Sequence, residues 1–366
     1  MTWIITLIVI ALAIWIGARL LLAGSDLSEF DMPRPEPIND APSAGNQQVL
    51  ETVREFARTA ASSKGRAQLL QMREAMESMG DNADLSGVEI RAATVSGRPA
   101  EWVLATSRRG SGRLLYLHGG AFTMGSPKSH RGITAELARR TGLDVLAVDY
   151  RLMPEHPRRA GIDDCRAAYR WILENGPAGP EPADTVFIAG DSAGGNLTLA
   201  LIAWLRDQRN SSARLRQADG AIALSPLTDS TFASPSMRHN VDRDPMLGPM
   251  AKLINKVPRT LMLWGSWLQN RIRPNDPLVS PLRGDLSNLP PVLVQASEAE
   301  ILIDDARRYA NKARASGTPA EIETWHGMVH AWQAFGIGLP ESEQAFTRMA
   351  EFVRRVLDSR GRADAA

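Results

Sequence analysis

Residues 185–194 read Thr-Val-Phe-Ile-Ala-Gly-Asp-Ser-Ala-Gly, a short apolar run that leads directly into a Gly-x-Ser-x-Gly pentad. A strand followed by this pentad and then by an apolar helix is typical of a nucleophile elbow, in which a sharp turn exposes the serine above the edge of a sheet. Glycines flank such a turn because they carry no side chain to obstruct it. The stretch therefore predicts a buried strand at 185–189, a turn at Ser192 and a helix after it.

Outward from this elbow, strand-like and helical patterns alternate along the chain. The predicted strands are short apolar or alternating runs at 87–94, 100–106, 114–117, 145–148, 185–189, 221–224 and 292–294. The predicted helices carry apolar residues at three- and four-residue spacing, at 132–141, 161–174, the segment after Ser192 and 341–358. Such alternation implies the α/β class, with a mainly parallel central sheet covered by helices on both faces.

Two further regions are expected to lie outside this alternating core. Residues 47–85 have helical character, and residues 230–275 form an insertion rich in Pro, Met and Trp between two predicted strands. An insertion above the strand ends would cover the serine as a cap. We therefore divide the chain into N-terminal cap helices at 47–85 and a catalytic domain at 86–366 that carries the insertion.

The first 24 residues are unlike the rest of the chain. Residues 3–18 contain no charge, and after Arg19 the apolar character continues to Leu22. A helix needs roughly 20 such residues to span a bilayer. A cleavable signal peptide is the alternative: Ala23 and Ser25 fit a cleavage site, but the run is long and no Lys or Arg precedes it.

We predict an uncleaved single-pass membrane anchor at 1–24, in a bacterial inner membrane, followed by a Pro-rich linker at 25–46. Cleavage would instead give a secreted or periplasmic protein. Arg19 and Arg34 favour a cytoplasmic domain, although two residues determine orientation poorly.

The overall composition is that of an ordinary globular protein, with 44% hydrophobic and 23% charged residues. The formal net charge is +1, and no segment concentrates basic residues, so no nucleic-acid partner is expected. Cys165, the single cysteine, falls on the apolar stripe of the predicted helix 161–174 and is interpreted as a core residue. The sequence gives no indication of the oligomeric state.

Candidates for a base and an acid follow the last predicted strands. A serine hydroxyl becomes a nucleophile when a base accepts its proton and a third group holds that base. His326 and His330 are candidate bases, and the segment 298–305 supplies four carboxylates. The histidine spacing also fits a helical zinc pair, but Gly327 disfavours a helix and no carboxylate lies between them, so no metal is expected.

A third element of the chemistry is a set of N–H donors for the oxyanion that forms when the serine attacks. The His118-Gly119-Gly120 segment follows a predicted strand, and glycine lets backbone N–H groups approach a substrate closely. The N–H group of Ala193, directly after the serine, would complete this oxyanion hole. His118 itself is interpreted as a structural residue that orients the loop.

Several separate motifs together resemble the hormone-sensitive-lipase-like family of α/β-hydrolase carboxylesterases, which includes bacterial esterases and arylacetamide deacetylases. The resemblance covers about 110–335 and rests on His118-Gly119-Gly120-Ala121-Phe122, Asp149-Tyr150-Arg151-Leu152 with Pro154-Glu155, Gly190-Asp191-Ser192-Ala193-Gly194-Gly195-Asn196, Asp276-Pro277-Leu278-Val279-Ser280-Pro281, Leu289-Pro290-Pro291-Val292 and Gly327-Met328-Val329-His330.

The resemblance implies a role for each matching residue. Ser192 would be the nucleophile and His330 the base, and the oxyanion donors would be the backbone N–H groups of Gly119, Gly120 and Ala193. It also implies a cap built from the N-terminal helices and the mid-chain insertion.

The chain departs from the family pattern at two positions. Ala121 replaces the last glycine of His-Gly-Gly-Gly, which keeps the N–H group but narrows the acyl pocket. Glu300 stands where the family often has aspartate, and a glutamate can hold the imidazole equally well. We assign the triad acid to Glu300, with Asp304 as the competitor.

The implied activity is that of a serine carboxylesterase acting on short or medium acyl esters, without metal or organic cofactor. A lactone, thioester or amide would engage the same machinery, so lactonase, amidase or other acyl hydrolase activity is the alternative. A non-catalytic small-molecule receptor is also known on this fold, but it would be expected to lack a member of the triad. The expected partners are a small acyl ester and, through 1–24, a membrane.

Overall fold

The computed structural model describes residues 2–108, 110–208, 215–335 and 338–364. Its centre is an eight-stranded sheet in the order β1-β2-β4-β3-β7-β8-β9-β10. The strands are β1 (Val88–Val95), β2 (Arg98–Ala105), β3 (Gly112–Leu117), β4 (Asp144–Val148), β7 (Thr185–Asp191), β8 (Gly220–Leu224), β9 (Val292–Ser297) and β10 (Ala320–Trp325). β2 pairs antiparallel with β1 and β4, and all other neighbours are parallel. The mainly parallel sheet expected from the alternation is therefore confirmed.

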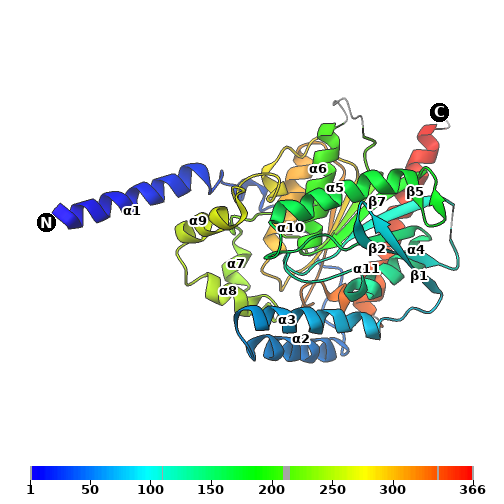
Figure 1. Ribbon diagram of the computed structural model, residues 1–366, viewed down its shortest axis with the longest axis horizontal. Helices are drawn as coiled ribbons and strands as arrows, with labels where there is room; N and C mark the ends of the chain where they lie inside the picture. Colours follow the sequence, from blue (N-terminus) through cyan, green and yellow to red (C-terminus); the bar gives the residue numbers. More distant parts are fainter. Residues whose placement is uncertain (1, 109, 209–214, 336–337, 365–366) are drawn as a thin grey trace.

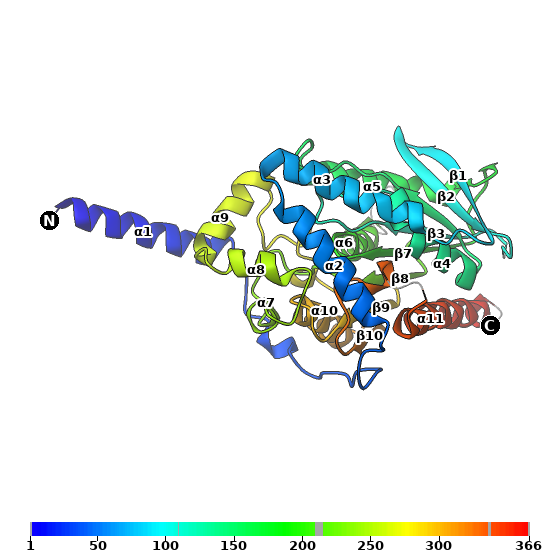
Figure 2. The ribbon, with the colours of Figure 1, turned by 90° about the horizontal axis from the view of Figure 1, so that it is seen from below.

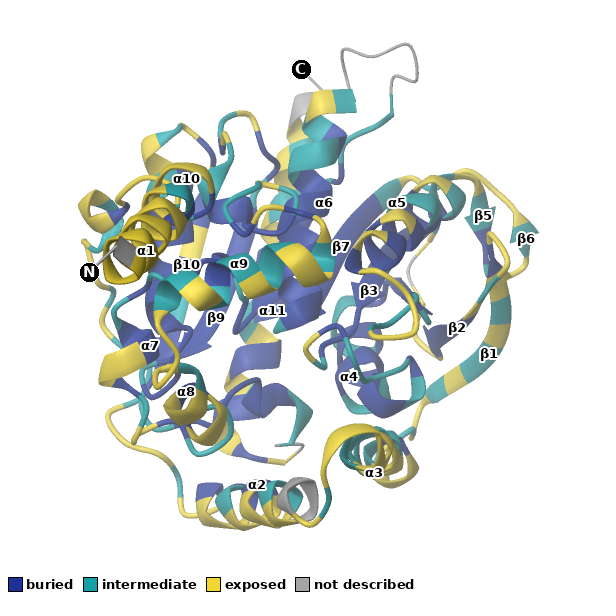
Figure 3. Cartoon of the chain, turned by 60° about the vertical axis from the view of Figure 1, so that its left-hand side comes forward, coloured by how far each residue is buried: buried dark blue, intermediate teal, exposed yellow. Residues whose placement is uncertain are grey.

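Helices cover both faces of this sheet (Figures 1 and 3). One face packs on α5 (Arg158–Glu174), α6 (Ala193–Gln208) and α10 (Ile303–Ala315), and the other on α4 (Arg131–Thr141) and α11 (Pro340–Asp364). Alternate residues of each strand serve the two cores. In β3, for example, Leu115 and Leu117 join the first core, whereas Leu114 and Tyr116 join the second.

The N-terminal helices and the insertion form a second group of elements outside the sheet. α2 (Asn46–Ala61) and α3 (Gly65–Glu77) pack side by side, and η2 (Ser78–Asn82) follows them. The insertion forms α7 (Ser236–His239), α8 (Gly248–Ile254) and α9 (Arg259–Asn270). Figure 2 shows α8 and α9 on the side of the molecule from which the first helix projects.

That first helix, α1 (Thr2–Leu21), extends away from the rest of the chain and is exposed along most of its length (Figures 1 and 3). Its stretch Trp3–Leu21 is long and apolar enough to cross a membrane, and only 6% of its most apolar window is buried. It is therefore not a core helix of the domain. Its last turns contact α9, where Ala18, and Leu22 directly after the helix, pack against Leu263.

The segment expected as a linker lies against the catalytic domain. It contains the short helix η1 (Ser28–Phe30). Asp31 pairs with Arg308 at 2.6 Å, and Asn311 donates hydrogen bonds to the carbonyl oxygens of Phe30 and Pro33. These contacts attach the segment to α10.

Sequence analysis identifies neither α10 nor β10, nor a small hairpin of β5 (Asn175–Gly176) and β6 (Gly179–Pro180). It treats 298–305 as a loop, whereas Asp304 and Asp305 lie in the first turn of α10. The other expected strands and helices are present to within a few residues of the stated bounds.

Candidate active site

The parallel strands bring the predicted site residues to one edge of the sheet, because their carboxyl ends share that edge. The loop containing Gly119 and Gly120 follows β3, Ser192 follows β7, Glu300 follows β9 and His330 follows β10. Residues spread over more than 200 positions of sequence thus lie at the same edge of the sheet.

Ser192 stands on a sharp turn between β7 and α6. Its φ of 53° is in the left-handed region, which is unusual for a residue with a side chain. A Cβ atom on Gly190 would lie 2.5 Å from the carbonyl oxygen of Leu117, and one on Gly194 would lie 1.8 Å from the same oxygen. Both positions therefore require glycine, and the expected turn is confirmed.

His330 and Glu300 form a buried pair. The distance from His330 Nδ1 to Glu300 Oε2 is 2.6 Å. The other carboxylate oxygen accepts hydrogen bonds from the Ser225 hydroxyl and from the Ser297 N–H, both at 2.7 Å. His330 Nε2 is buried and has no hydrogen-bond partner among the described residues. A proton held on Nδ1 by Glu300 leaves this second nitrogen free to act as a base.

The electrostatics of the pair favour the charged imidazolium. Burial by itself lowers the pKa of His330, but the charge and hydrogen bond of Glu300 outweigh it, so the pKa is raised above its ordinary value of 6.5. A base that gains a proton in the transition state is stabilised by the same carboxylate.

Asp304, the competing acid, contacts other groups. It accepts a hydrogen bond from the Ser236 N–H at 2.8 Å and pairs with Arg307 at 3.3 Å. No hydrogen bond joins it to His330 in the described part of the chain. Glu300 is therefore the carboxylate in contact with the histidine.

The expectation that Gly119 donates to an oxyanion is corrected by its hydrogen bond. Its N–H donates to Asp191 Oδ1 at 2.9 Å and is not available to a substrate. A Cβ atom at this position would lie 2.0 Å from Asp191 Oδ2. Glycine is needed here to let this carboxylate approach the loop, rather than to let the loop approach the substrate.

The next two residues of the loop keep their N–H groups free. Gly120 has φ 105° and Ala121 has φ 54°, and neither N–H donates a hydrogen bond to another described residue. Successive N–H groups in such a conformation form a concave nest that binds anions. The N–H of Ala193 lies at the start of α6, where backbone donors have no partner within the helix.

Asp191 is the centre of a buried network beneath this loop. Besides the Gly119 N–H, its Oδ1 accepts the Tyr116 hydroxyl at 2.7 Å and lies 3.4 Å from His130 Nε2. His130 Nδ1 in turn lies 2.9 Å from the Ser129 hydroxyl. Burial disfavours both charges, yet their attraction outweighs it: the pKa of His130 is raised, and that of Asp191 is lowered to about 2.

His118 has the surroundings expected of a structural residue. Its ring stacks on Tyr150 with centroids 4.2 Å apart, and the Tyr150 hydroxyl donates to the His118 carbonyl at 2.6 Å. Burial and the neighbouring His130 lower its pKa to about 3, so the imidazole stays neutral.

Two buried groups near the site are absent from the sequence-based assignment. One is the Asp191–His130 pair. Asp191 is the variable residue directly before the serine in the Gly-x-Ser-x-Gly pentad, and a charged residue at that position was the signal that could have identified the pair. The other is Arg158, whose guanidinium lies 3.9 Å from the Phe122 ring centroid and donates to Asn196 Oδ1 at 3.0 Å. Nothing in the sequence pattern distinguishes Arg158 from a surface arginine.

The second candidate base, His326, is held by its backbone, which donates to Asn39 Oδ1 at 2.7 Å. Among the described residues, no three His, Cys, Asp or Glu side chains are grouped so that they could hold a metal ion.

A serine on a strained strand-to-helix turn and a buried histidine–carboxylate pair, both after strands of a mainly parallel sheet, are features of an α/β-hydrolase. The chain matches the family profile described as alpha/beta hydrolase fold over residues 114–334. It is 38% identical over 261 residues to an acetyl-hydrolase of Streptomyces hygroscopicus, covering 71% of this chain and 81% of that protein. An esterase of Acinetobacter venetianus is 36% identical over 265 residues, or 72% of this chain and 82% of the relative.

Solved structures agree. An esterase of the bacterial hormone-sensitive lipase family superposes with a TM-score of 0.72 at 35% identity, over 86% of this chain and 99% of that one. A hormone-sensitive lipase from a metagenome library gives 0.70 at 29% identity, over 87% and 99%. The chain belongs to the α/β-hydrolase family, within the group of bacterial hormone-sensitive-lipase-like esterases, and it is a carboxylic ester hydrolase.

Proposed function

We propose that the protein is a serine carboxylesterase for short and medium acyl esters, with Ser192 as nucleophile, His330 as base and Glu300 as the acid that holds it. The observation that carries this proposal is the 2.6 Å contact between Glu300 and His330, at the same sheet edge as the strained serine. A relative named acetyl-hydrolase supports the short end of the acyl range.

In this mechanism His330 Nε2 accepts the hydroxyl proton as Ser192 Oγ attacks the ester carbonyl. The tetrahedral intermediate collapses when the imidazolium returns the proton to the leaving alcohol, which leaves an acyl group on Ser192. Water then attacks the acyl-enzyme with His330 again as base, and the acid is released. Glu300 keeps Nδ1 protonated throughout, so that Nε2 always faces the reacting atoms.

The oxyanion would be held by the N–H groups of Gly120, Ala121 and Ala193. Ala121 replaces Gly119 in this assignment, because the Gly119 N–H donates to Asp191 and the Ala121 N–H is free. Each such donor contributes ~2.7–4 kcal/mol of transition-state stabilisation.

We also propose that the N-terminal helices and the insertion cap the site. The support comes from α3, whose Arg73 donates to the Thr123 carbonyl at 2.7 Å and pairs with Glu155 at 2.8 Å. Thr123 lies three residues after Gly120, so α3 rests directly on the loop of the oxyanion hole. The cap would then determine which acyl chains and alcohols enter.

Initial rates on p-nitrophenyl esters from acetyl to dodecanoyl test the proposed activity, with Ser192→Ala as the matched control. We expect the short esters to be hydrolysed and the variant to lose at least ~10³-fold in kcat. A wild-type protein that leaves all the esters intact but opens lactones or cleaves amides would contradict the ester assignment and retain the triad. Equal inactivity of both proteins on all these bonds would favour a receptor.

We propose further that α1 remains on the mature protein as a single-pass membrane anchor. Its exposed apolar surface and its seam with α9 support this, because a cleaved signal peptide needs no packing partner in the folded domain. Extraction of membranes at alkaline pH should leave the protein in the pellet, with an N-terminus upstream of Ala23. A mature protein that begins after Ala23 or Ser25 would contradict the anchor.

A further inference from the structure

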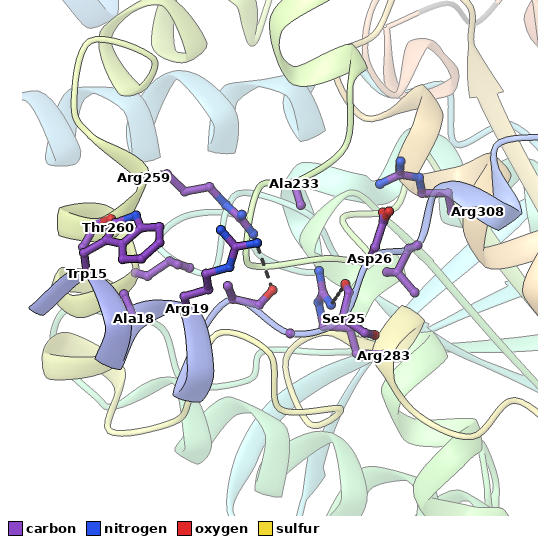
Figure 4. Close-up of a pocket in the computed structure, with 14 residues that line it drawn as sticks. Trp15, Ala18, Arg19, Ser25, Asp26, Ala233, Arg259, Thr260, Arg283 and Arg308 are labelled. Carbon is purple, nitrogen blue, oxygen red and sulfur yellow. Dashed lines mark hydrogen bonds between the residues drawn. The ribbon is translucent and has the colours of Figure 1, made fainter. Parts of the chain in front are cut away.

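An open cavity of about 450 Å³ lies where α1 meets the rest of the chain (Figure 4). Its walls come from the last turns of α1, the segment 23–27, the start of α9 and the nearby surface of the catalytic domain. We call it the anchor pocket. Four arginines line it, together with a single carboxylate, and these are Arg19, Arg259, Arg283, Arg308 and Asp26.

Two of these arginines are neutralised by the domain itself. Arg283 forms a two-pronged ion pair with buried Asp229, at 2.8 Å for each prong, and Arg308 pairs with Asp31 at 2.6 Å. These ion pairs fix the positions of the two side chains. Arg283 also donates to the Ser25 carbonyl at 3.0 Å, which fixes the chain where it leaves α1.

The other two arginines have no carboxylate partner among the described residues. Arg259 donates only to neutral oxygens, those of Thr231 and the Ala23 carbonyl, at 3.0–3.4 Å. Arg19 lies over the Trp15 ring at 5.4 Å. Two guanidinium groups that line one cavity repel each other unless an anion lies between them. Burial lowers the pKa of Arg259 and outweighs the opposing attraction of Asp229, and the charges of Arg283 and Arg238 also lower it.

The pocket lies at the boundary between apolar and polar surface. Arg19 is the basic residue in the last turn of α1, and Trp264 of α9 donates through Nε1 to the Ile14 carbonyl at 3.0 Å. Trp264 and Trp267 pack beside α1, and tryptophan is enriched where a bilayer meets water. With α1 in a membrane, Arg19 and Arg259 lie at the depth of lipid headgroups.

The insertion also exposes apolar side chains next to the anchor pocket. Outside α1, seven large hydrophobic side chains are exposed in the described residues, and five of them lie in or between α8 and α9: Met250, Leu253, Val257, Leu261 and Leu268. Apolar helix surface beside an anchor is suited to lie in the interfacial layer of a bilayer. The acyl chains of a lipid whose headgroup occupied the pocket would meet this surface.

We propose that the anchor pocket binds the phosphate group of an anionic phospholipid, with Arg19 and Arg259 as its principal ligands. Guanidinium forms paired, charge-assisted hydrogen bonds with phosphate oxygens. The bound lipid would join α1 to α9 and hold the capped face of the domain against the membrane. The inference rests on the membrane attachment proposed above.

The test uses the full chain in dodecyl maltoside, with bound lipid counted by native mass spectrometry. The probes are dimyristoyl phosphatidylglycerol, dimyristoyl phosphatidylcholine and inorganic phosphate. The variants are Arg259→Gln and Arg19→Gln, and Arg243→Gln is the matched control, since Arg243 is exposed, lies in the same insertion and does not line the pocket. Circular dichroism checks that each variant is folded. If Arg259→Gln does not fold, the comparison of wild type with Arg19→Gln is the test.

We expect one phosphatidylglycerol to bind about tenfold more tightly than phosphatidylcholine or inorganic phosphate. Loss of one charge-assisted contact should weaken phosphatidylglycerol binding about tenfold in each pocket variant. The affinity of Arg243→Gln for phosphatidylglycerol should equal that of the wild type. Equal binding by wild type and both pocket variants would overturn the site. Inorganic phosphate binding as tightly as the lipid would overturn the assignment to a lipid.

Flotation with neutral phosphatidylcholine vesicles separates this inference from the anchor. A wild-type protein that does not float refutes both the anchor and the lipid site. Flotation combined with binding that is insensitive to the pocket variants refutes the lipid site alone, and neither result bears on the rates of ester hydrolysis.

Discussion

Two buried histidine–carboxylate pairs lie at the same edge of the sheet. They differ in whether the second ring nitrogen of the histidine has a hydrogen-bond partner. In the pair formed by His330 and Glu300, Nδ1 contacts the carboxylate and Nε2 has no partner among the described residues. In the pair formed by His130 and Asp191, the carboxylate faces Nε2 and Nδ1 contacts the Ser129 hydroxyl. The pKa of each histidine is raised by its carboxylate.

The difference indicates how the same chemistry serves two purposes. A histidine with both nitrogens engaged fixes the geometry around it, and here it holds the carboxylate that accepts the Gly119 N–H. A histidine with one free nitrogen can exchange a proton with a substrate. Burial, charge and pKa direction are shared, so the unengaged nitrogen is what distinguishes the pair that we propose as catalytic from the pair beneath the loop.

Glu300→Gln should produce the largest effect on this comparison. The amide no longer fixes the tautomer of His330 or stabilises its charged form, and kcat should fall by about 10⁴. Asp304→Asn is the control and should retain nearly full kcat, because Asp304 contacts Ser236 and Arg307. Comparable losses in the two variants, measured on p-nitrophenyl acetate, would refute the assignment of the acid.

Asp191→Asn should have a smaller effect on rate and a measurable effect on stability. The loop loses the acceptor that holds Gly119 in place, and a displacement of about 1 Å in such a loop costs roughly 10²-fold in kcat. Removing one charge from a buried pair costs about 3 kcal/mol of unfolding free energy. Urea unfolding and kcat together measure both effects. Wild-type values for both would show that the Asp191–His130 pair neither stabilises the fold nor positions the loop.

The stabilisation by this pair should also depend on pH. The lowered pKa of Asp191 contributes stability above the unfolded value of 3.8, which is lost as the pH falls towards about 2. The raised pKa of His130 contributes stability below 6.5, which is lost as the pH rises through the folded value. The stability difference between wild type and Asp191→Asn should therefore be greatest at about pH 4–6.5, and a difference that is constant with pH would contradict the pairing.

The pH profile of kcat/KM tests the catalytic pair. Since His330 must be neutral to act as a base and its pKa is raised, the acid limb of the profile should lie above pH 6.5. In Glu300→Gln the residual activity should show the limb at lower pH, because the raising charge is gone. An acid limb at the same pH in wild type and Glu300→Gln would show that Glu300 does not raise the pKa of the base.

Ala121→Gly should have the smallest effect. The N–H group is retained, and glycine adopts φ 54° without strain, so kcat/KM on acetyl esters should stay within about threefold, or ~0.6 kcal/mol. The added space should favour longer acyl chains in the ratio of dodecanoyl to acetyl rates. A large loss on all esters would mean that the alanine methyl group itself shapes the loop.

The sequence was sufficient for features whose cause is local. The Gly-x-Ser-x-Gly pentad requires its turn because of contacts within a few residues and with the adjacent strand, and β7, which leads into it, is buried from Val186 to Asp191. The family motifs singled out Glu300 and His330, which follow β9 and β10 at the same edge of the sheet.

Features that depend on distant partners were not predictable in the same way. The contact that engages the Gly119 N–H comes from a residue 72 positions away. The apolar positions of α10 are mainly alanines, and its buried residues include Asp304, Arg307 and Arg308, which form ion pairs in the fold. β10 lies at the end of the sheet and alternates glutamates with apolar residues, which is itself a strand signal and could have identified it.

The most direct test of the central claim is labelling with a fluorophosphonate, followed by mass spectrometry of the peptide that contains Ser192. We predict a single covalent adduct on Ser192 in the wild type, with no adduct in Ser192→Ala and labelling at least ~10³-fold slower in His330→Ala. An adduct on another residue, or a wild-type rate that is unchanged by loss of His330, would contradict the catalytic assignment.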